Sequence, residues 1–373
     1  MDRLTVAILF GGRSGEHEVS LMSARSVLNK IDRSIFDAIE IGITHEGVWC
    51  VGNDVITSFE KGQTENLQRA FLIPEPGNHM IYIEKTVDEI THMIPYKKID
   101  VIFPVLHGTF GEDGTLQGLL DLIEIPYVGA GVLGSSVGMD KGIFKQIMRA
   151  INIPVVDDLV FTRKEITANI DDVVKKCELL GPYPFFTKPA NMGSSVGINK
   201  CRDRDALLKG LKNAATYDRR VLVEIGLTKP MEVEVSVLGN EYPKASIAGE
   251  IVPGDEFYTY DDKYFNGVSI LNIPAELPDG MMNQIQDMAI KAYSAIDCAG
   301  MARVDFLIDQ DKEKIYLNEL NTIPGFTQIS MYAKLWEASG IHYSDLISKL
   351  IELAQDRHKE KLMSSHQFIR EEA

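Results

Sequence analysis

RVDFLID (residues 303–309) and KIYLNELN (residues 314–321) are two strand-like segments joined by a short polar turn. They predict a β-hairpin. If its turn centres on Lys312, the numbers of paired residues sum to about 624, the register of a simple antiparallel pair. Asp305 then lies opposite Glu319, and Arg303 lies opposite Asn321. Because side chains alternate between the faces of a strand, all four project from one side of the hairpin.

This face has the composition of a magnesium site. Two carboxylates and an amide oxygen are the hard ligands that Mg²⁺ takes, with water and phosphate completing its shell. Arg303 beside them can neutralise a developing negative charge. A solvated hairpin with outward charges would look similar. The Pro-Gly turn that follows, within TIPGFT (residues 322–327), favours the functional reading because it offers backbone N–H groups to an oxyanion.

A second segment is suited to phosphate. The loop KPANMGSSVG (residues 188–197) follows a predicted strand, Phe185–Lys188, and contains two glycines and two serines. Backbone N–H groups and hydroxyls in such a loop can contact phosphate oxygens. No Gly-Lys-Ser/Thr ends the loop, so it is not a Walker A motif. A flexible surface loop is the alternative interpretation.

The first third of the chain alternates between strand and helix patterns, which predicts a parallel sheet flanked by helices. Ligands bind at the carboxyl ends of the strands in such sheets. The loops at residues 10–17 and 105–114 should face the site. Glu16 could there hold a substrate ammonium, and His107 is a candidate polar contact with substrate. A Gly- and Ser-rich break is expected at residues 129–138.

Composition restricts the possible partners. The 373 residues carry a formal net charge of −16, which disfavours binding to nucleic acid or to an anionic membrane. The four cysteines form no C-x-x-C pair, so neither a zinc site nor a disulfide framework is indicated. Because the chain shows neither a signal peptide nor an apolar stretch of membrane-spanning length, we expect a cytoplasmic protein.

The segment Gly254–Gly267 is rich in Tyr, Asp and Gly and has no regular periodicity. It reads as a long loop between strands, and long loops often act as lids over active sites. An ordinary surface excursion is the alternative. The dense aromatic residues argue against that alternative, because exposed rings usually bind something.

Together these segments resemble the D-alanine–D-alanine ligase family of the ATP-grasp fold. The matching stretches are GGRSGEHEVS, LHGTFGEDGTLQG, KPANMGSSVG, YDDKY, GMARVDF, NELNTIPGFT and SMYAKLW, spread over residues 11–336. The resemblance implies an α/β protein with a three-domain ATP-grasp architecture and an N-terminal parallel-sheet domain. The expected divisions are an N-terminal substrate-binding domain (1–135), a central ATP-grasp subdomain (136–225), a C-terminal subdomain with the metal site and lid (226–360) and a polar tail (361–373).

The resemblance also implies roles for individual residues. Catalysis would use Glu16, Ser194, Tyr264, Arg303 and the backbone N–H of Gly325. Contacts with the amino-acid substrates would come from His107, Ser330 and Met331. ATP would be bound by Lys141, Lys188, Glu224, Glu232 and Lys263. Two Mg²⁺ ions, or Mn²⁺ in their place, would be bound by Asp305, Glu319 and Asn321.

The implied reaction joins two D-alanines for peptidoglycan precursor synthesis. ATP phosphorylates the first carboxylate, and the amine of the second D-alanine displaces phosphate. Relatives that make an ester with lactate often lack the tyrosine found here at position 264, so Tyr264 favours the dipeptide. We expect a homodimer. The alternatives are another carboxylate–amine ligase of the ATP-grasp group, a dehydrogenase, whose dinucleotide loop is missing, and a non-catalytic ATP-binding scaffold, in which the metal residues would be eroded.

Overall fold

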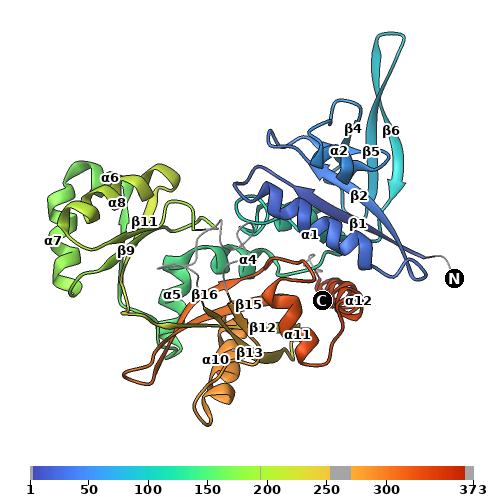
Figure 1. Ribbon diagram of the computed structural model, residues 1–373. Helices are drawn as coiled ribbons and strands as arrows, with labels where there is room; N and C mark the ends of the chain where they lie inside the picture. Colours follow the sequence, from blue (N-terminus) through green and yellow to red (C-terminus); the bar gives the residue numbers. More distant parts are fainter. Residues whose placement is uncertain (1–2, 194, 253–269, 366–373) are drawn as a thin grey trace, which may run out of the picture.

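Three β-sheets follow one another along the chain in the computed structural model (Figure 1). The structure describes residues 3–193, 195–252 and 270–365. The first sheet has seven strands, the second four and the third five. Figure 1 shows the second sheet set apart from the other two, with helices on one of its faces.

The first unit is built around β1, a continuous apolar strand that is buried on both faces, as a central strand of a parallel sheet should be. Helix α1 leaves the carboxyl end of β1 and packs back against it. The elements of this unit are β1 (Leu4–Gly11), α1 (His17–Lys30), β2 (Phe36–Ile43), β3 (Trp49–Val51), α2 (Val55–Glu60), β4 (Gln68–Leu72), β5 (Met80–Val87), β6 (Ile90–Lys98), β7 (Val101–Pro104), α3 (Thr115–Ile123) and α4 (Val132–Met139).

The expected parallel sheet is a mixed one. Strand β1 pairs in parallel with β2 and β7, but β2 through β6 pair antiparallel in sequence order. The physical reason is the length of the connections, because a two-residue link such as Asp88–Glu89 between β5 and β6 can only reverse the chain. Both residues have positive φ without being glycine, so the usual sequence signal of a tight turn is missing.

The second unit holds the predicted phosphate loop between β9 and β10. Its strands run in the order β10-β9-β11-β8, and all the pairs are antiparallel. Three of its helices, α6, α7 and α8, form a separate apolar core with buried side chains of β9 and β11. The buried side chains of α5 pack in the core of the third unit instead. The elements are α5 (Lys141–Ala150), β8 (Asp158–Thr162), α6 (Arg163–Ala168), α7 (Ile170–Leu180), β9 (Phe185–Pro189), β10 (Asn199–Cys201), α8 (Arg204–Tyr217) and β11 (Arg220–Ile225).

The third unit contains the predicted hairpin as β15 and β16. Asp305 pairs with Glu319 and Arg303 with Asn321, as predicted. Nearer the turn, however, Asp309 pairs with Lys314, one residue out of the predicted register, and a bulge at Asn318 restores it. The elements are β12 (Met231–Gly239), β13 (Lys244–Val252), β14 (Ile270–Asn272), α10 (Met281–Ala295), β15 (Gly300–Asp309), β16 (Lys314–Asn321), α11 (Met331–Ala338) and α12 (Tyr343–Lys361).

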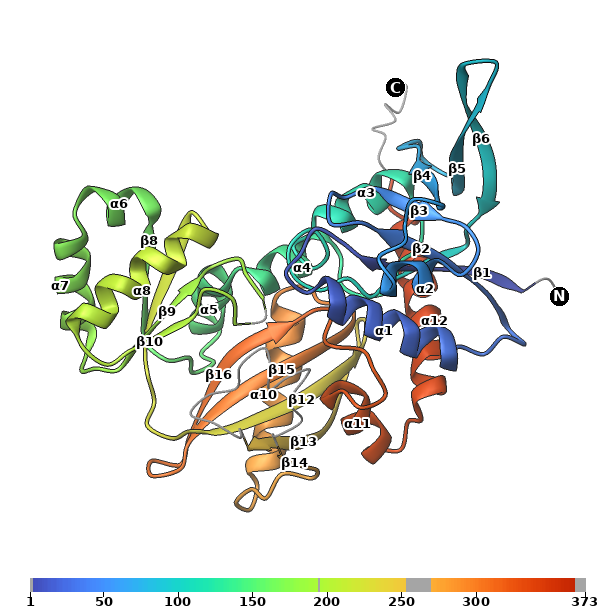
Figure 2. The same cartoon turned by 45° about the horizontal axis from the view of Figure 1, so that its top comes forward.

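Helix α12, near the C-terminal end of the chain, packs against the N-terminal unit. Its buried face, which includes Leu346, Ile347 and Leu350, shares one apolar core with β1 and α1, and Figure 2 shows it beneath the first sheet. The first and third units are therefore held together by hydrophobic burial rather than by a linker.

The expected break at residues 129–138 is mostly helix α4. A side chain at Gly134 would come within 2.9 Å of the carbonyl oxygen of Asp297, and one at Gly138 within 3.0 Å of Thr322. The small residues of this segment allow α4 to pack closely on the third unit, which is why they do not form a loose linker.

Among the described residues, no helix combines the length and the apolar composition required to cross a bilayer.

Candidate active site

A pocket of about 320 Å³ brings together loops from all three units. Its walls include the phosphate loop, the β15–β16 hairpin and the start of α1. Nine of the residues singled out in the sequence line it: Glu16, His107, Lys141, Arg303, Glu319, Asn321, Gly325, Ser330 and Met331. Segments more than 300 residues apart in the chain thus form one site, as the resemblance implied.

Glu16 lies where the first and second units meet. A side chain added at Gly108 would come within 2.5 Å of the Glu16 Oε2 atom, and one added at Gly193 within 2.4 Å. The carboxylate is therefore enclosed by two loops that leave no room for a Cβ atom. It is 8% exposed, which suits a fixed negative charge that recognises an ammonium group at the pocket wall.

The hairpin residues form a charged cluster at the pocket floor. The Arg303 guanidinium donates two hydrogen bonds to Asp305, from Nε to Oδ1 and from Nη2 to Oδ2, both 2.7 Å long. Asn321 Nδ2 donates to Asp305 Oδ2 at 3.0 Å. This bidentate geometry fixes the planes of both charged groups. The predicted catalytic arginine and the predicted metal ligands are thus in direct contact.

A third carboxylate in this cluster was missed by sequence reasoning. Glu234 pairs with Asp305 across β12 and β15, and its Oε2 atom lies 3.0 Å from Arg303 Nε. Glu234 is 6% exposed and lines the pocket. Its position depends on the pairing of two strands that are about 70 residues apart, and no local pattern reveals that pairing. Glu234 and Asp305 both contact Arg303, while Glu319 lies opposite Asp305 and near Lys141. Three carboxylates thus face two cations, and the cluster carries excess negative charge.

Lys141 connects this cluster to the phosphate loop. Its Nζ atom donates to the Met192 carbonyl oxygen at 2.9 Å and lies 3.7 Å from Glu319 Oε2. Lys141 is the first residue of α5, and the side chain of Asp140 caps that helix by accepting from Ile143 N–H at 2.9 Å. The lysine is therefore held between a predicted metal ligand and the loop predicted to bind phosphate.

A second charged cluster is buried in the central unit. The two oxygens of Glu224 contact different lysines: Oε2 lies 2.5 Å from Lys145 Nζ, and Oε1 contacts Lys188 Nζ. Burial would raise the pKa of Glu224, but the two ammonium groups outweigh it and lower the pKa to about 2. Glu224 is therefore fully ionised at neutral pH. Its predicted contact with ATP stays a prediction.

Lys145 is a further residue missed by sequence reasoning. It lies four residues after Lys141 on α5, at a position that faces the core, and its side chain is 1% exposed. Burial lowers its pKa, opposed by the charge of Glu224. A lysine on the apolar side of an amphipathic helix could have been recognised as a sign of a buried partner.

Lys188 lies close enough to both clusters for their carboxylates to change its pKa. Burial tends to lower its pKa, but Glu224, then Glu319 and Glu232, raise it above the ordinary value. Glu232 is half-buried on β12. Lys188 therefore keeps its positive charge within range of the predicted nucleotide residues.

His107 and Ser23 hold the loop at residues 322–327. His107 Nδ1 donates to the Ile323 carbonyl at 2.9 Å, and its Nε2 lies 3.0 Å from Ser23 Oγ. Ser23 Oγ in turn accepts from Phe326 N–H at 3.3 Å. Burial lowers the pKa of His107, but the neighbouring Glu112 carboxylate outweighs it. Both ring nitrogens thus face protein groups, and the predicted substrate contact of His107 stays a prediction.

Ser330 and Met331 begin α11 at the edge of the pocket. Ser330 Oγ accepts from Thr327 N–H at 3.0 Å and lies 2.7 Å from Thr327 Oγ1. Met331 is 6% exposed and packs near Gly249. These contacts fix the turn that carries Gly325, whose N–H was predicted to bind an oxyanion.

Three predicted site residues, Ser194, Lys263 and Tyr264, lie outside the described residues. The same is true of the predicted lid, Gly254–Gly267.

The donor groups fit the nucleotide and metal that the sequence indicates. Asp305, Glu319 and Asn321 offer oxygens at one face of the hairpin, and hard divalent cations prefer such ligands. Lys141, beside Glu319, and Lys188, beside Glu224, carry the positive charge that phosphate oxygens require. A mixed N-terminal sheet is followed by two sheets, and Lys141, Glu319 and Asn321 line one pocket. This arrangement defines the ATP-grasp class of ligases.

Comparison with known proteins narrows this class. A family model described as D-ala D-ala ligase N-terminus matches residues 5–130, and one described as D-ala D-ala ligase C-terminus matches residues 147–352. The chain belongs to the D-alanine–D-alanine ligase family. It is 46% identical to a D-alanine–D-alanine ligase of Natranaerobius thermophilus over 99% of both chains. A ligase of the same name from Thermoanaerobacter sp. is 49% identical, covering 97% of this chain and 99% of the relative.

Solved structures agree with the fold. The D-alanine–D-alanine ligase of Coxiella burnetii superposes with a TM-score of 0.80 at 34% identity, covering 97% of this chain and 98% of that one. The VanG D-Ala:D-Ser ligase of Enterococcus faecalis gives a TM-score of 0.82 at 33% identity, covering 95% and 100%. The family and fold expected from the sequence are thereby confirmed, with the N-terminal sheet mixed rather than parallel.

Proposed function

We propose that this protein joins two D-alanines into D-alanyl-D-alanine at the expense of ATP, for peptidoglycan precursor synthesis. The observation that carries this proposal is that Glu16, Lys141, Arg303 and Glu319 line one pocket. An ammonium-binding carboxylate, a phosphate-binding lysine and a carboxylate cluster suited to Mg²⁺ then meet at a single substrate. Full-length similarity to ligases of this name supports the choice of substrate.

In the proposed reaction, a carboxylate oxygen of the first D-alanine attacks the γ-phosphorus of ATP, and the bond to ADP breaks. The acyl phosphate that forms is then attacked by the amine of the second D-alanine. The new C–N bond forms, the C–O bond to phosphate breaks, and the amine loses a proton to the surrounding water. Mg²⁺ bound by Asp305, Glu319 and Asn321 would screen charge during phosphoryl transfer.

The chain's own residues have separate tasks in this scheme. Glu16 orients the first D-alanine through its ammonium group. Lys141 and Lys188 neutralise the transferring phosphoryl group, while Arg303 and the Gly325 N–H stabilise the negative oxygen of the tetrahedral intermediate. Ser330 and Met331 meet the carboxylate of the second D-alanine, and Tyr264 directs the product to a peptide rather than an ester.

Membership of the family leaves the metal stoichiometry, the oligomeric state, the cellular location and the domain limits to be proposed separately. We propose two Mg²⁺ ions per site, a homodimer and a cytoplasmic location. We also propose the domain limits 1–135, 136–225 and 226–360 with a tail at 361–373.

The decisive experiment is phosphate release from ATP by the purified protein with Mg²⁺ and a panel of amino acids. D-alanine should support release and yield the dipeptide in mass spectrometry, while L-alanine should support neither. Equal activity with L-alanine would refute the substrate assignment. Release with another D-amino acid alone would keep the reaction type and change the substrate.

A further inference from the structure

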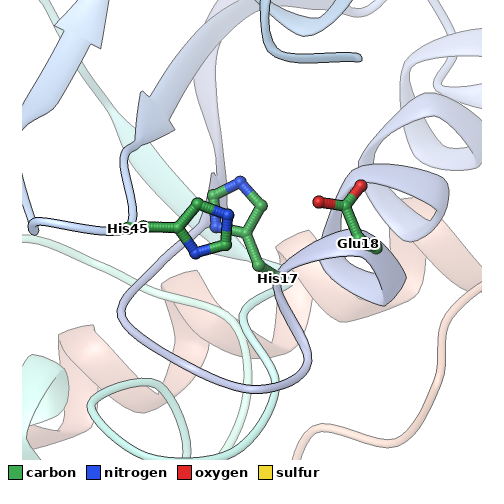
Figure 3. A group of neighbouring side chains, drawn as sticks. All are labelled: His17, Glu18 and His45. Carbon is green, nitrogen blue, oxygen red and sulfur yellow. The ribbon is translucent and has the colours of Figure 1, made fainter. Parts of the chain in front are cut away.

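A group of potential metal ligands lies outside the residues assigned to the reaction. His17 and Glu18 are the first two residues of α1, and His45 belongs to the loop between β2 and β3. One ligand atom from each residue lies within 4.8 Å of the other two. Figure 3 shows the two imidazole rings overlapping face to face, with a Glu18 oxygen directed toward them.

The hydrogen bonding of His17 prepares one of its ring nitrogens as a ligand. Its Nδ1 atom lies 2.9 Å from the carbonyl oxygen of Gly12, which can only accept a hydrogen bond. Nδ1 must therefore carry the proton, and in the neutral ring Nε2 holds a lone pair. Histidines that bind metals in proteins almost always donate their other ring N–H to a carbonyl or carboxylate in this way.

The surroundings of His17 fix its ring. The residue is 5% exposed and stacks on Phe59, with ring centroids 6.1 Å apart and planes 11° from parallel. Burial lowers its pKa, the hydrogen bond to Gly12 opposes this, and His45 lowers it further, with a net decrease. The ring is thus held in place by its neighbours, and its burial favours the neutral form, which is the form that binds a cation.

His45 and Glu18 are the adjustable members of the group. Both are exposed. The His45 ring stacks on His17 with centroids 3.8 Å apart and planes 24° from parallel. Lone pairs of stacked rings run side by side, so shared coordination requires the His45 side chain to turn out of the stack. Its ring makes no hydrogen bond within the described part of the chain, and an exposed side chain changes rotamer easily.

We propose that His17, His45 and Glu18 bind a divalent transition-metal ion of the zinc class. Two imidazole nitrogens and one carboxylate oxygen form a ligand set typical of open zinc sites, in which water takes the remaining position. Imidazole ligands favour Zn²⁺, Ni²⁺ or Cu²⁺ over Mg²⁺. The site therefore differs in chemistry from the all-oxygen set of the hairpin, and one protein can hold both kinds of ion at once.

The site is placed to act on the substrate pocket. Glu16 directly precedes His17, and Gly12, which accepts the His17 hydrogen bond, lies in the same turn. A bound ion would tie the loop of His45 to the start of α1 and restrain that turn.

The test is zinc binding to untagged, chelator-treated protein, measured by isothermal titration calorimetry with millimolar Mg²⁺ present to occupy the oxygen ligands. One equivalent of Zn²⁺ should bind. Replacing the exposed ligand in His45→Ala should weaken binding at least about tenfold, and Glu18→Gln should weaken it less. Cobalt substitution should give visible bands of a nitrogen-ligated ion, lost in His45→Ala.

A matched control is His342→Ala. His342 is also exposed and also lies beside a carboxylate, with its Nδ1 atom 2.7 Å from Glu337 Oε1. In the part of the chain that the structure describes, it belongs to no group of three potential ligands. Zinc affinity should be unchanged in this variant. Equal affinity in His45→Ala and the unmodified protein, or no saturable binding at one equivalent, would overturn the proposal. Neither result bears on the ligase activity, which is assayed separately.

Discussion

The two charged clusters of the site contrast in sign and in burial. At the hairpin and its neighbour β12, Glu234 and Asp305 contact Arg303, and Glu319 lies opposite Asp305 and near Lys141. Carboxylates are therefore in excess, and Glu234, Arg303 and Glu319 line the pocket. In the central unit, Lys145 and Lys188 share Glu224, so ammonium groups are in excess and all three side chains are nearly or fully buried. Each excess fits the ligand that we propose for that cluster, a divalent cation at the first and a phosphate group at the second.

The contrast also explains how charge is tolerated away from water. A buried ion costs several kcal/mol unless partners compensate it. Glu224 provides that compensation for Lys145 and Lys188 at once, which leaves one positive charge of the three groups uncompensated. On the hairpin, partial exposure reduces the cost, and Arg303 offsets only part of the negative charge. The charge balance of the hairpin cluster therefore depends on each of its members. The charge balance of the central cluster depends on its single carboxylate, Glu224.

The largest effect is expected from Glu319→Gln, which removes charge from the hairpin without changing its shape. Loss of a metal ligand removes several kcal/mol of transition-state stabilisation, so turnover should fall by at least about a thousandfold. Circular dichroism and the unfolding midpoint should not change. Glu313→Gln, an exposed residue in the turn of the same hairpin, is the control and should keep full activity. Near-normal turnover in Glu319→Gln would remove this residue from the metal site.

A smaller effect is expected from Lys145→Met, which breaks the buried cluster. The Glu224 Oε2 atom would lose its 2.5 Å contact and stay buried. An unsatisfied buried acceptor costs about 1–3 kcal/mol, measurable by urea unfolding at pH 7. Because Glu224 would then hold Lys188 alone, KM for ATP should rise more than kcat falls. Lys212→Met, an exposed position on α8, should change neither quantity. An unaltered KM would limit Lys145 to a structural role.

These two clusters also show how far the sequence could lead. The facing of Asp305 and Glu319 was predictable because strand alternation and turn length determine it to within one residue. Near the turn the actual pairing is shifted by one residue from the predicted register, and the bulge at Asn318 removes that shift before Asp305. No local sequence pattern predicts such a bulge. The prediction was correct at the site, although the assumed register does not hold along the whole hairpin.

The remainder of the site depends on long-range contacts. Glu234 joins the cluster only because β12 lies beside β15, and the order of strands in a sheet is set by tertiary packing. Lys145 did leave a signal, a charged residue at a core-facing position of α5. The sheet of the first unit was misjudged because residues 49–98 form antiparallel strands, and the Asp88–Glu89 turn lacks the glycine that usually identifies a hairpin.

The smallest effect concerns pH and separates the buried cluster from ordinary surface charge. Two ammonium groups outweigh burial and lower the pKa of Glu224 from 4.5 to about 2. A carboxyl group whose pKa is lower in the folded state stabilises the fold above its unfolded pKa. That contribution is lost as pH falls toward the folded pKa. The stability difference between the unmodified protein and Glu224→Gln should therefore shrink by about 1 kcal/mol between pH 6 and pH 3.5.

Urea unfolding of both proteins at the two pH values measures this difference. Glu352→Gln, an exposed position on α12, supplies the comparison, and its stability difference should stay constant over the same range. If the Glu224→Gln difference also stayed constant, Glu224 would titrate alike in the folded and unfolded states. The two lysines would then not be held by an ionised carboxylate, and the contrast between a cation-binding and an anion-binding cluster would lose its electrostatic basis.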